Sequence, residues 1–231
     1  MADTFTDDAP AIANQISADL ESIETSLGFL KDCFQAICSD WSDTDATGLQ
    51  VKALQAQNIW LPAHQWKPTS TAGCAALANT ELTTNDIQLE YLAFDHTTQE
   101  HATISRVMPE GWDLGTIKAK FYWVPTTGCS ASDVVVWGIQ GVAVSNDDAI
   151  DATMGDAVTK SDTVLAGTTG DLHVSDATDA ITIGGTPALG DLIHLKIYRD
   201  ADSEVDTMTE EDAWLIGVML QVTIDQEVTA W

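Results

Sequence analysis

The sequence is poor in basic residues. Only nine of its 231 residues are lysine or arginine, against 36 aspartates and glutamates, which gives a formal net charge of −27. Nucleic-acid binding depends mainly on lysine and arginine side chains that displace counterions, so this balance excludes DNA and RNA as partners. Acidic surfaces keep protein molecules apart and hold water in salty surroundings, and we interpret the charge mainly as a source of solubility.

Cysteines are few and scattered, and long apolar runs are missing. Cys33, Cys38, Cys74 and Cys129 include no Cys-x-x-Cys pair, which argues against a zinc site and against a disulfide framework. No run approaches the roughly 18 apolar residues that a membrane-spanning helix needs. The first ten residues lack the basic and then apolar pattern of a secretion signal. We expect no membrane partner.

Recognisable catalytic motifs are also missing. The sequence has no nucleophile elbow, no phosphate-binding P-loop and no dinucleotide-binding glycine motif. His96 and the Glu100-His101 pair approximate His-x-x-Glu-His, but one residue too many separates them. The sequence therefore predicts a non-enzymatic protein without a required cofactor.

One acidic stretch has the spacing of a calcium-binding loop. Its oxygen ligands would be Asp200, Asp202, Glu204 and Asp206, with Glu211 in the twelfth position. However, Val205 stands where that loop requires glycine, and expected strands flank it where helices should. We interpret the stretch as a solvated acidic hairpin and keep a Ca²⁺ site as the alternative.

A heptad pattern marks the N-terminal part. Apolar residues recur at alternating spacings of four and three, at Ile16, Leu20, Ile23, Leu27, Leu30, Phe34 and Ile37. A seven-residue repeat is typical of an intermolecular helical seam, although a helix packed on its own domain would also place these residues on one face. We predict a coiled coil or helical bundle within residues 1–41. Leucine at a and isoleucine at d favour more than two strands, hence a homotrimer.

The remainder reads as β-structure. Residues 42–57 form an expected linker, with a short helix resuming at 49–57, and alternation of period two dominates from Asn58 onward. Strands are expected at 58–61, 87–93, 102–106, 117–123, 134–144, 172–174, 181–183, 193–197 and 214–224. Asn146 is the expected N-cap of a short helix over residues 147–158. This many antiparallel strands predict a jelly-roll-like sandwich over residues 58–231.

Eight tryptophans stand out in so small a protein. Most of them fall on the apolar faces of expected strands, which predicts that they pack in the core. An exposed subset would instead offer flat stacking platforms for sugars. The candidates are Trp60, Trp66, Trp112, Trp123, Trp137, Trp214 and Trp231.

Several turns and strand ends carry a resemblance to a known family. They are Leu61-Pro62-Ala63 with Trp66-Lys67-Pro68-Thr69, Phe94-Asp95 before Thr98-Gln99-Glu100, Met108-Pro109 with Gly111-Trp112, Val135-Val136-Trp137-Gly138, Asp147-Asp148-Ala149, Ile181-Thr182-Ile183 before Pro187, and Gly190-Asp191-Leu192. Over residues 58–225 the sequence resembles small jelly-roll-like structural proteins of tailed-phage virions.

The resemblance implies a role at the virion surface after assembly in the host cytoplasm. A non-enzymatic homotrimer would decorate the capsid or form a head fibre, in preference to a tail component. Its partners would be further copies of itself and the major capsid protein or tail proteins. The alternative function is a receptor- or glycan-binding module at the tip of a fibre.

Overall fold

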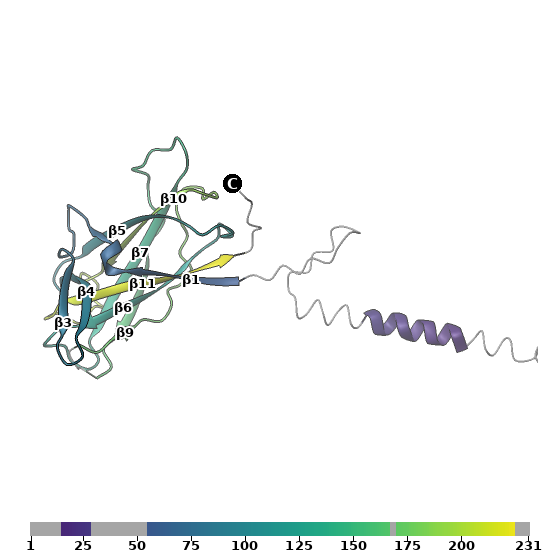
Figure 1. Cartoon of the computed structure of the whole chain (residues 1–231), viewed down its shortest axis with the longest axis horizontal. Coiled ribbons are helices and arrows are strands. Elements are labelled where there is room, and N and C mark those ends of the chain that lie inside the picture. The colour runs from purple at the N-terminus through teal and green to yellow at the C-terminus, as the bar shows by residue number, and fades with distance from the viewer. Residues whose placement is uncertain (1–14, 29–54, 167–169, 225–231) are drawn as a thin grey trace, which may run out of the picture. The chain divides into compact units, whose positions relative to one another are not determined.

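The computed structural model describes residues 15–28, 55–166 and 170–224. The chain divides into two compact units, Met1–Ala53 and Leu54–Trp231. We call the second unit the head. It holds every described strand, and Figure 1 shows these strands packed as a sandwich.

The described part of the first unit is an α-helix over residues 15–28. The hydroxyl groups of Thr25 and Ser26 donate hydrogen bonds of 2.8 Å to carbonyl oxygens one turn back, at Glu21 and Ser22 respectively. The seam residues Ile16, Leu20, Ile23 and Leu27 are 55–60% exposed. Leu30, Phe34 and Ile37 lie outside the described residues. The helix is confirmed where it is described, and the trimer stays a prediction.

None of the helices described is long and apolar enough to cross a membrane.

The described strands form two antiparallel sheets. The first, called the β11 sheet, has the order β3 (Ala78–Leu82), β4 (Ile87–Phe94), β11 (Ala213–Ile224), β6 (Lys118–Pro125) and β9 (His173–Val174), and β1 (Gln55–Pro62) also pairs with β11. The second, called the β10 sheet, has the order β2 (Lys67–Pro68), β5 (Glu100–Val107), β10 (Leu192–Arg199), β7 (Val134–Val144) and β8 (Val158–Thr163). A short 3₁₀ helix, η1 (Ala63–Gln65), follows β1.

The strand order is that of a jelly roll. From β4 to β11, the first, third, sixth and eighth strands lie in the β11 sheet, in the order β4-β11-β6-β9. The second, fourth, fifth and seventh lie in the β10 sheet, in the order β5-β10-β7-β8. Two Greek keys rolled together give this arrangement. It confirms the predicted jelly-roll-like sandwich.

The core lies between the sheets, where alternate residues of the strands meet. On β6, Phe121 and Trp123 are fully buried while Lys118 and Lys120 are exposed, as the alternation predicts. Trp137 of β7 stacks on Phe121 with ring centroids 5.5 Å apart. This contact joins the two sheets.

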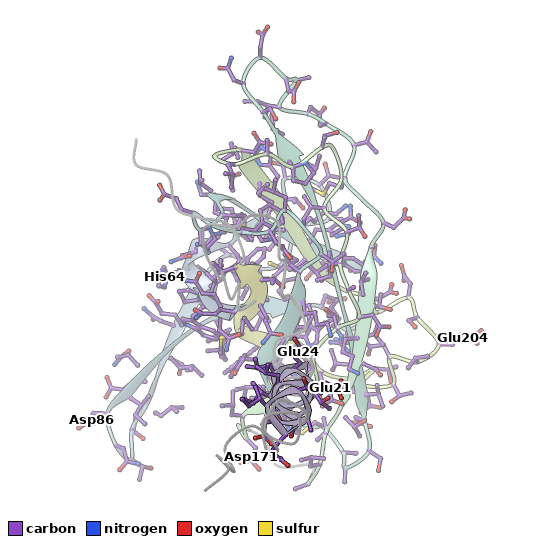
Figure 2. All side chains as sticks on the ribbon, turned by 90° about the vertical axis from the view of Figure 1, so that its right-hand side faces the viewer. Glu21, Glu24, His64, Asp86, Asp171 and Glu204 are labelled. Atoms are coloured by element: carbon purple, nitrogen blue, oxygen red, sulfur yellow. The ribbon has the colours of Figure 1, made fainter. Side chains whose placement is uncertain are left out.

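Acidic side chains project from the loops around the head. Figure 2 shows Asp86 at the tip of the β3–β4 hairpin and Glu204 in the loop before β11. Both positions leave the carboxylate in solvent, where its charge costs little. This placement fits the interpretation of the acidic composition as a source of solubility.

The expected helix at residues 147–158 is wrong. The segment forms turns and bends and then enters β8 at Val158. Asp147 has a positive φ of 72°, and the Asp148 carboxylate accepts the Ser145 backbone N–H at 3.1 Å. The acidic pair therefore closes a turn after β7, where a helix N-cap was expected.

Three strand predictions also need correction. Residues 55–57 of the expected helix at 49–57 belong to β1, which starts three residues before Asn58, and residues 49–54 lie outside the described chain. The expected strand at 181–183 is reduced to a bridge between Ile117 and Ile181. The strands β2, β3 and β8 were not expected. β2 has only two residues, and β3 and β8 have mostly polar sequences that alternate between half-buried and exposed positions.

Candidate functional site

Three rows of side chains cross the outer face of the β11 sheet. They come from β6, β11 and β1, whose pairing aligns Tyr122 with Gly217 and Pro62, Lys120 with Met219 and Trp60, and Lys118 with Gln221 and Asn58. The alternate residues of the same strands, such as Leu61 and Val218, are fully buried. The pleat therefore puts two aromatic rings, two lysines and two amides on one surface.

Trp60 and Tyr122 form an aromatic ridge across this surface. Their ring centroids are 4.9 Å apart and the rings meet edge to face at 80°. Trp60 reaches across β11 because Gly217 has no side chain. A Cβ at Gly217 would lie 2.6 Å from two ring carbons of Trp60. Trp60 keeps 42% of its surface exposed, which is unusual for so large an apolar side chain.

A hollow lies on each side of the ridge. The smaller, of about 250 Å³, is bordered by Asn58, Lys118, Lys120, Tyr122, Met219 and Gln221, and we call it the lysine hollow. The larger, of about 510 Å³, is bordered by Trp60, His64, Asn79, Gln88, Glu90 and Ile216, and we call it the η1 hollow. Tyr122 borders the first and Trp60 the second, so the ridge separates them.

Strand pairing explains the η1 hollow. β4 pairs with β11 only at residues 213–215, and β1 takes over the same edge from Gly217 onward. At the change of partner Ile216 forms a bulge opposite β6. The chain leaves β1 through η1, so β4 and β1 part and leave the space between them open.

Both hollows combine apolar floors with hydrogen-bonding groups at their rims. In the lysine hollow the Gln221 amide donates to the Asn58 amide oxygen at 3.3 Å. In the η1 hollow His64 Nδ1 lies 2.9 Å from a Glu90 carboxylate oxygen. Flat rings with a few directional polar groups are the usual composition of a small-molecule site.

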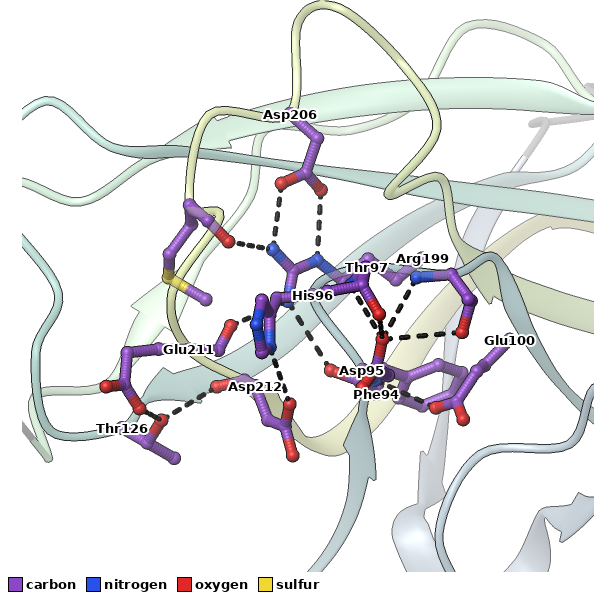
Figure 3. A network of polar contacts seen from close by, with 12 residues as sticks. Phe94, Asp95, His96, Thr97, Glu100, Thr126, Arg199, Asp206, Glu211 and Asp212 are labelled. Atoms are coloured by element: carbon purple, nitrogen blue, oxygen red, sulfur yellow. Dashed lines mark hydrogen bonds and ion pairs between the residues drawn. The ribbon is translucent and has the colours of Figure 1, made fainter.

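A second polar cluster lies at the end of β10 and is structural. Arg199 is fully buried and donates two hydrogen bonds to Asp206, from Nη2 at 2.8 Å and from Nε at 3.0 Å. Arg199 Nη1 also donates to the carbonyl oxygens of Glu211 at 2.9 Å and Phe94 at 3.4 Å. Figure 3 shows how these bonds tie the loop before β11 to both sheets.

This network engages two of the proposed ligands of the calcium-loop alternative. Both carboxylate oxygens of Asp206 are engaged, one by Arg199 alone and the other by Arg199 and the Val136 N–H. Asp200 accepts a hydrogen bond from Gln99 at 2.6 Å. Asp200, Asp202, Glu204 and Asp206 do not belong to the cluster of ligating groups found among the described residues, which fits the acidic hairpin better than the Ca²⁺ site.

Within the described residues a different trio of ligating groups comes together. Asp95, His96 and Asp212 offer ligand atoms that all lie within 4.8 Å of one another. Burial acts to raise the pKa of Asp95, but hydrogen bonds from Thr97 and Thr98 outweigh it and lower that pKa below its usual value. Burial raises the pKa of the neighbouring Glu100. The Asp95 carboxylate serves mainly to close its own turn (Figure 3).

The tryptophan prediction is confirmed in its main part. Four of the candidates are core residues, each at most 2% exposed: Trp66, Trp112, Trp123 and Trp137. Trp214 is half-buried and stacks on Tyr91 with centroids 3.9 Å apart. Trp60 is the exposed one, and Trp231 lies outside the described chain.

The alternation of the strand expected at 117–123 puts Lys118 and Lys120 on its polar face but does not connect them with Trp60. Strand pairing brings these residues together from positions about 60 apart in the chain, and no local pattern reports that pairing. Gly217 was the available signal, since a glycine inside a strand often marks a bulge or a close approach.

No protein-family model matches the sequence, and a search of curated proteins finds no match either. Among solved structures, the CBM22-2 xylan-binding domain from Paenibacillus barcinonensis Xyn10C is similar with a TM-score of 0.43 and 14% identity, covering 71% of this chain and 98% of that one. The family 11 carbohydrate-binding module from Clostridium thermocellum has a TM-score of 0.39 and 11% identity, and the match covers 71% of this chain and 94% of that one. The structure of infectious bursal disease virus Gx strain is similar with a TM-score of 0.33 and 11% identity, and the match covers 81% of this chain and 38% of that one.

Proposed function

We propose that the head is a glycan-binding module. The observation that carries this proposal is the exposed Trp60–Tyr122 ridge between two hollows on one sheet face. A pyranose ring has one flat face of C–H groups, which stacks on an aromatic ring, and a rim of hydroxyls that needs hydrogen-bond partners. The amides of Asn58, Gln221, Asn79 and Gln88 stand on either side of the ridge to provide them.

The arrangement suits an oligosaccharide better than a single sugar. The two hollows adjoin the same ridge, so successive sugars of one chain could occupy both while the middle of the ligand lies on Trp60. A rigid sheet holds these groups in place before the ligand arrives, which lowers the entropic cost of binding. Binding through this face would need no catalytic group, in keeping with the prediction of a non-enzymatic protein.

A glycan array followed by titration calorimetry tests the proposal. The wild-type head should bind at least one class of glycan, and Trp60→Ala should lower the affinity about tenfold or more. Leu189→Ala removes a side chain that is 51% exposed and borders neither hollow, so it should bind as the wild type does. A wild-type protein that binds no glycan on the array, or a Trp60→Ala variant with unchanged affinity, would overturn the proposal.

We further propose that the helix assembles three copies at the surface of a tailed-phage virion, as a capsid decoration or head fibre. Two observations support this role: the heptad stripe at Ile16, Leu20, Ile23 and Leu27 is more than half exposed, and the head sequence resembles virion proteins. A helix with such a stripe gains stability when a second and third copy cover it. Three joined heads would also bind a glycan surface with avidity.

Light scattering tests the assembly. The wild-type chain should have three times the monomer mass, and Leu20→Asp with Leu27→Asp should give monomers. The control, Ser22→Asp with Thr25→Asp, adds the same charge on the outer positions of the heptad and should stay trimeric. A monomeric wild type would refute the assembly, and a trimeric Leu20/Leu27 variant would show that the heads hold the oligomer.

Rebinding tests the virion role. Purified trimers should return to particles stripped of this protein and should be recovered with them by sedimentation. Trimers that stay in solution beside particles exposing the major capsid protein would count against capsid decoration, while leaving the glycan-binding proposal intact.

A further inference from the structure

The lysine hollow gathers positive charge in a protein that has very little. Lys118 and Lys120 are two of nine basic residues in a chain with 36 acidic ones, and they stand two positions apart on β6. The alternation of the strand directs both to the outer face, and both are exposed. Two cations thus border a single hollow of about 250 Å³.

Neither lysine is neutralised by an acidic neighbour. Among the residues that the structure describes, neither forms an ion pair, whereas Lys160 pairs with Asp176 and Arg199 with Asp206. No carboxylate of the described chain borders the lysine hollow. With carboxylates so abundant elsewhere, these two lysines stand out because no carboxylate of the described residues forms an ion pair with them.

The partners around the lysines suit an anionic sugar. Across the hollow Asn58 and Gln221 offer amide groups for hydroxyls, while Met219 and Tyr122 provide an apolar floor and wall. Side chains at positions i and i+2 of a strand stand roughly 7 Å apart at their bases, and lysine stems are long enough for both ammonium groups to reach one anion. A carboxylate or a sulfate on a sugar ring has this charge and size.

The η1 hollow has the opposite electrostatic character. No lysine or arginine of the described residues borders it, and Glu90 stands at its rim. A carboxylate here repels an anion and instead accepts hydrogen bonds from hydroxyl groups. The negative field of the rest of the chain is screened within about 8 Å at physiological ionic strength, so the nearest charges decide what each hollow accepts.

We propose that the ligand is an anionic glycan, whose uronic acid or sulfated sugar occupies the lysine hollow while a neutral sugar lies across the ridge on Trp60. This inference rests on the proposed glycan-binding function and specifies its ligand class. The shared chemistry is an anionic group on a pyranose ring. Polygalacturonate carries it as a carboxylate and dextran sulfate as a sulfate ester.

The test is titration calorimetry of the full chain with polygalacturonate, dextran sulfate and uncharged dextran, each at 50 mM and 500 mM NaCl. At least one anionic polymer should bind about tenfold or more tightly than dextran, and the preference should shrink at the higher salt concentration. The polymer that binds more tightly identifies carboxylate or sulfate as the recognised group.

Lys118→Gln with Lys120→Gln should abolish the preference for the anionic polymer and leave the weaker, salt-independent binding unchanged. The control, Lys67→Gln with Lys160→Gln, removes the same charge from outside the hollow and should keep the preference. Because all four lysines are at the surface or half-buried, thermal melting should show each variant folded.

The outcomes separate the two proposals. Equal or tighter binding to uncharged dextran, or a preference that survives in the Lys118/Lys120 variant, overturns the anionic ligand while the glycan-binding function stands. Absence of binding to all three polymers and to every glycan of the array overturns both.

Discussion

Replacing Gly217 by alanine tests whether a close approach holds the ridge in place. A Cβ at this position would lie 2.6 Å from two ring carbons of Trp60 and 2.7 Å from the Leu61 carbonyl oxygen, whereas ordinary contact begins at 3.4 Å. The indole must therefore retreat by about 0.8 Å, and the backbone of β1 must yield as well. Overpacking of this kind costs about 1–3 kcal/mol of unfolding free energy.

Trp60 can swing outward, since 42% of its surface is already exposed. We therefore expect a loss in the lower part of that range, about 1–2 kcal/mol, which includes the edge-to-face contact with Tyr122 at about 0.5–1.5 kcal/mol. Glycan affinity should fall about tenfold or more because both hollows change shape with the ridge. Guanidinium unfolding measures the first quantity and calorimetry the second.

The matched control is Gly28→Ala, which adds the same methyl group to the helix where nothing lies within 4 Å. It should leave glycan binding unchanged and stabilise the helix slightly, as alanine favours helices over glycine. If Gly217→Ala melts and binds like the wild type, the ridge does not depend on the missing side chain. Such a result would refute the role of Gly217 in shaping the site.

Three further predictions concern buried and half-buried groups. Asp206→Ala should lower the free energy of unfolding, measured with guanidinium, by about 3–5 kcal/mol because it leaves the buried Arg199 charge unpaired. Adding Arg199→Met should recover much of this loss, and a loss below about 1 kcal/mol would contradict the prediction. Burial raises the pKa of Glu100, so its ionised form destabilises the fold. Glu100→Gln should therefore raise the melting temperature at pH 7, and this gain should vanish as the pH falls below 4.5. A gain that does not depend on pH would contradict the prediction. Burial raises the pKa of Cys74 to about 12, so native protein at pH 8 should leave this thiol unmodified by Ellman's reagent and unfolded protein should expose it; rapid modification of Cys74 in the native state would contradict this.

Most strands of the head could be predicted because buried strands have apolar residues in a regular pattern along the sequence. The run at Val134–Val144 is almost wholly buried and apolar, and its bounds were predicted to the residue. The strand β8 gave no such signal. It lies at the edge of the β10 sheet, where it alternates between exposed and half-buried residues and needs no apolar face.

The helix predicted at 147–158 was wrong because the same residue types begin helices and close turns. Asn146, Asp147 and Asp148 have the composition of a helix N-cap, but aspartate also closes turns and tolerates positive φ, as Asp147 does at 72°. The acidic stretch at residues 200–206 illustrates a related point. Sequence spacing cannot report that Asp206 turns inward to a buried arginine while Glu204 stays in solvent.

The candidate site depends on long-range pairing, which a single sequence does not disclose. Trp60, Tyr122 and Met219 could each be placed on an outer face by alternation. Their assembly on one surface follows from β11 pairing with β1 on one edge and β6 on the other. The jelly-roll prediction implied pairing of this kind but did not give its register.

The position of β11 has a consequence for how the protein is made. This strand is the last of the described chain, yet it lies in the middle of its sheet, between the strands that carry Trp60 and Tyr122. During synthesis β1 and β6 leave the ribosome long before the strand that joins them, and pairings so distant in sequence form slowly. Trp60 therefore meets Tyr122 only after the whole head has been translated. Nascent and truncated chains would lack the Trp60–Tyr122 ridge, so we expect a chain that presents the ridge to have completed its fold.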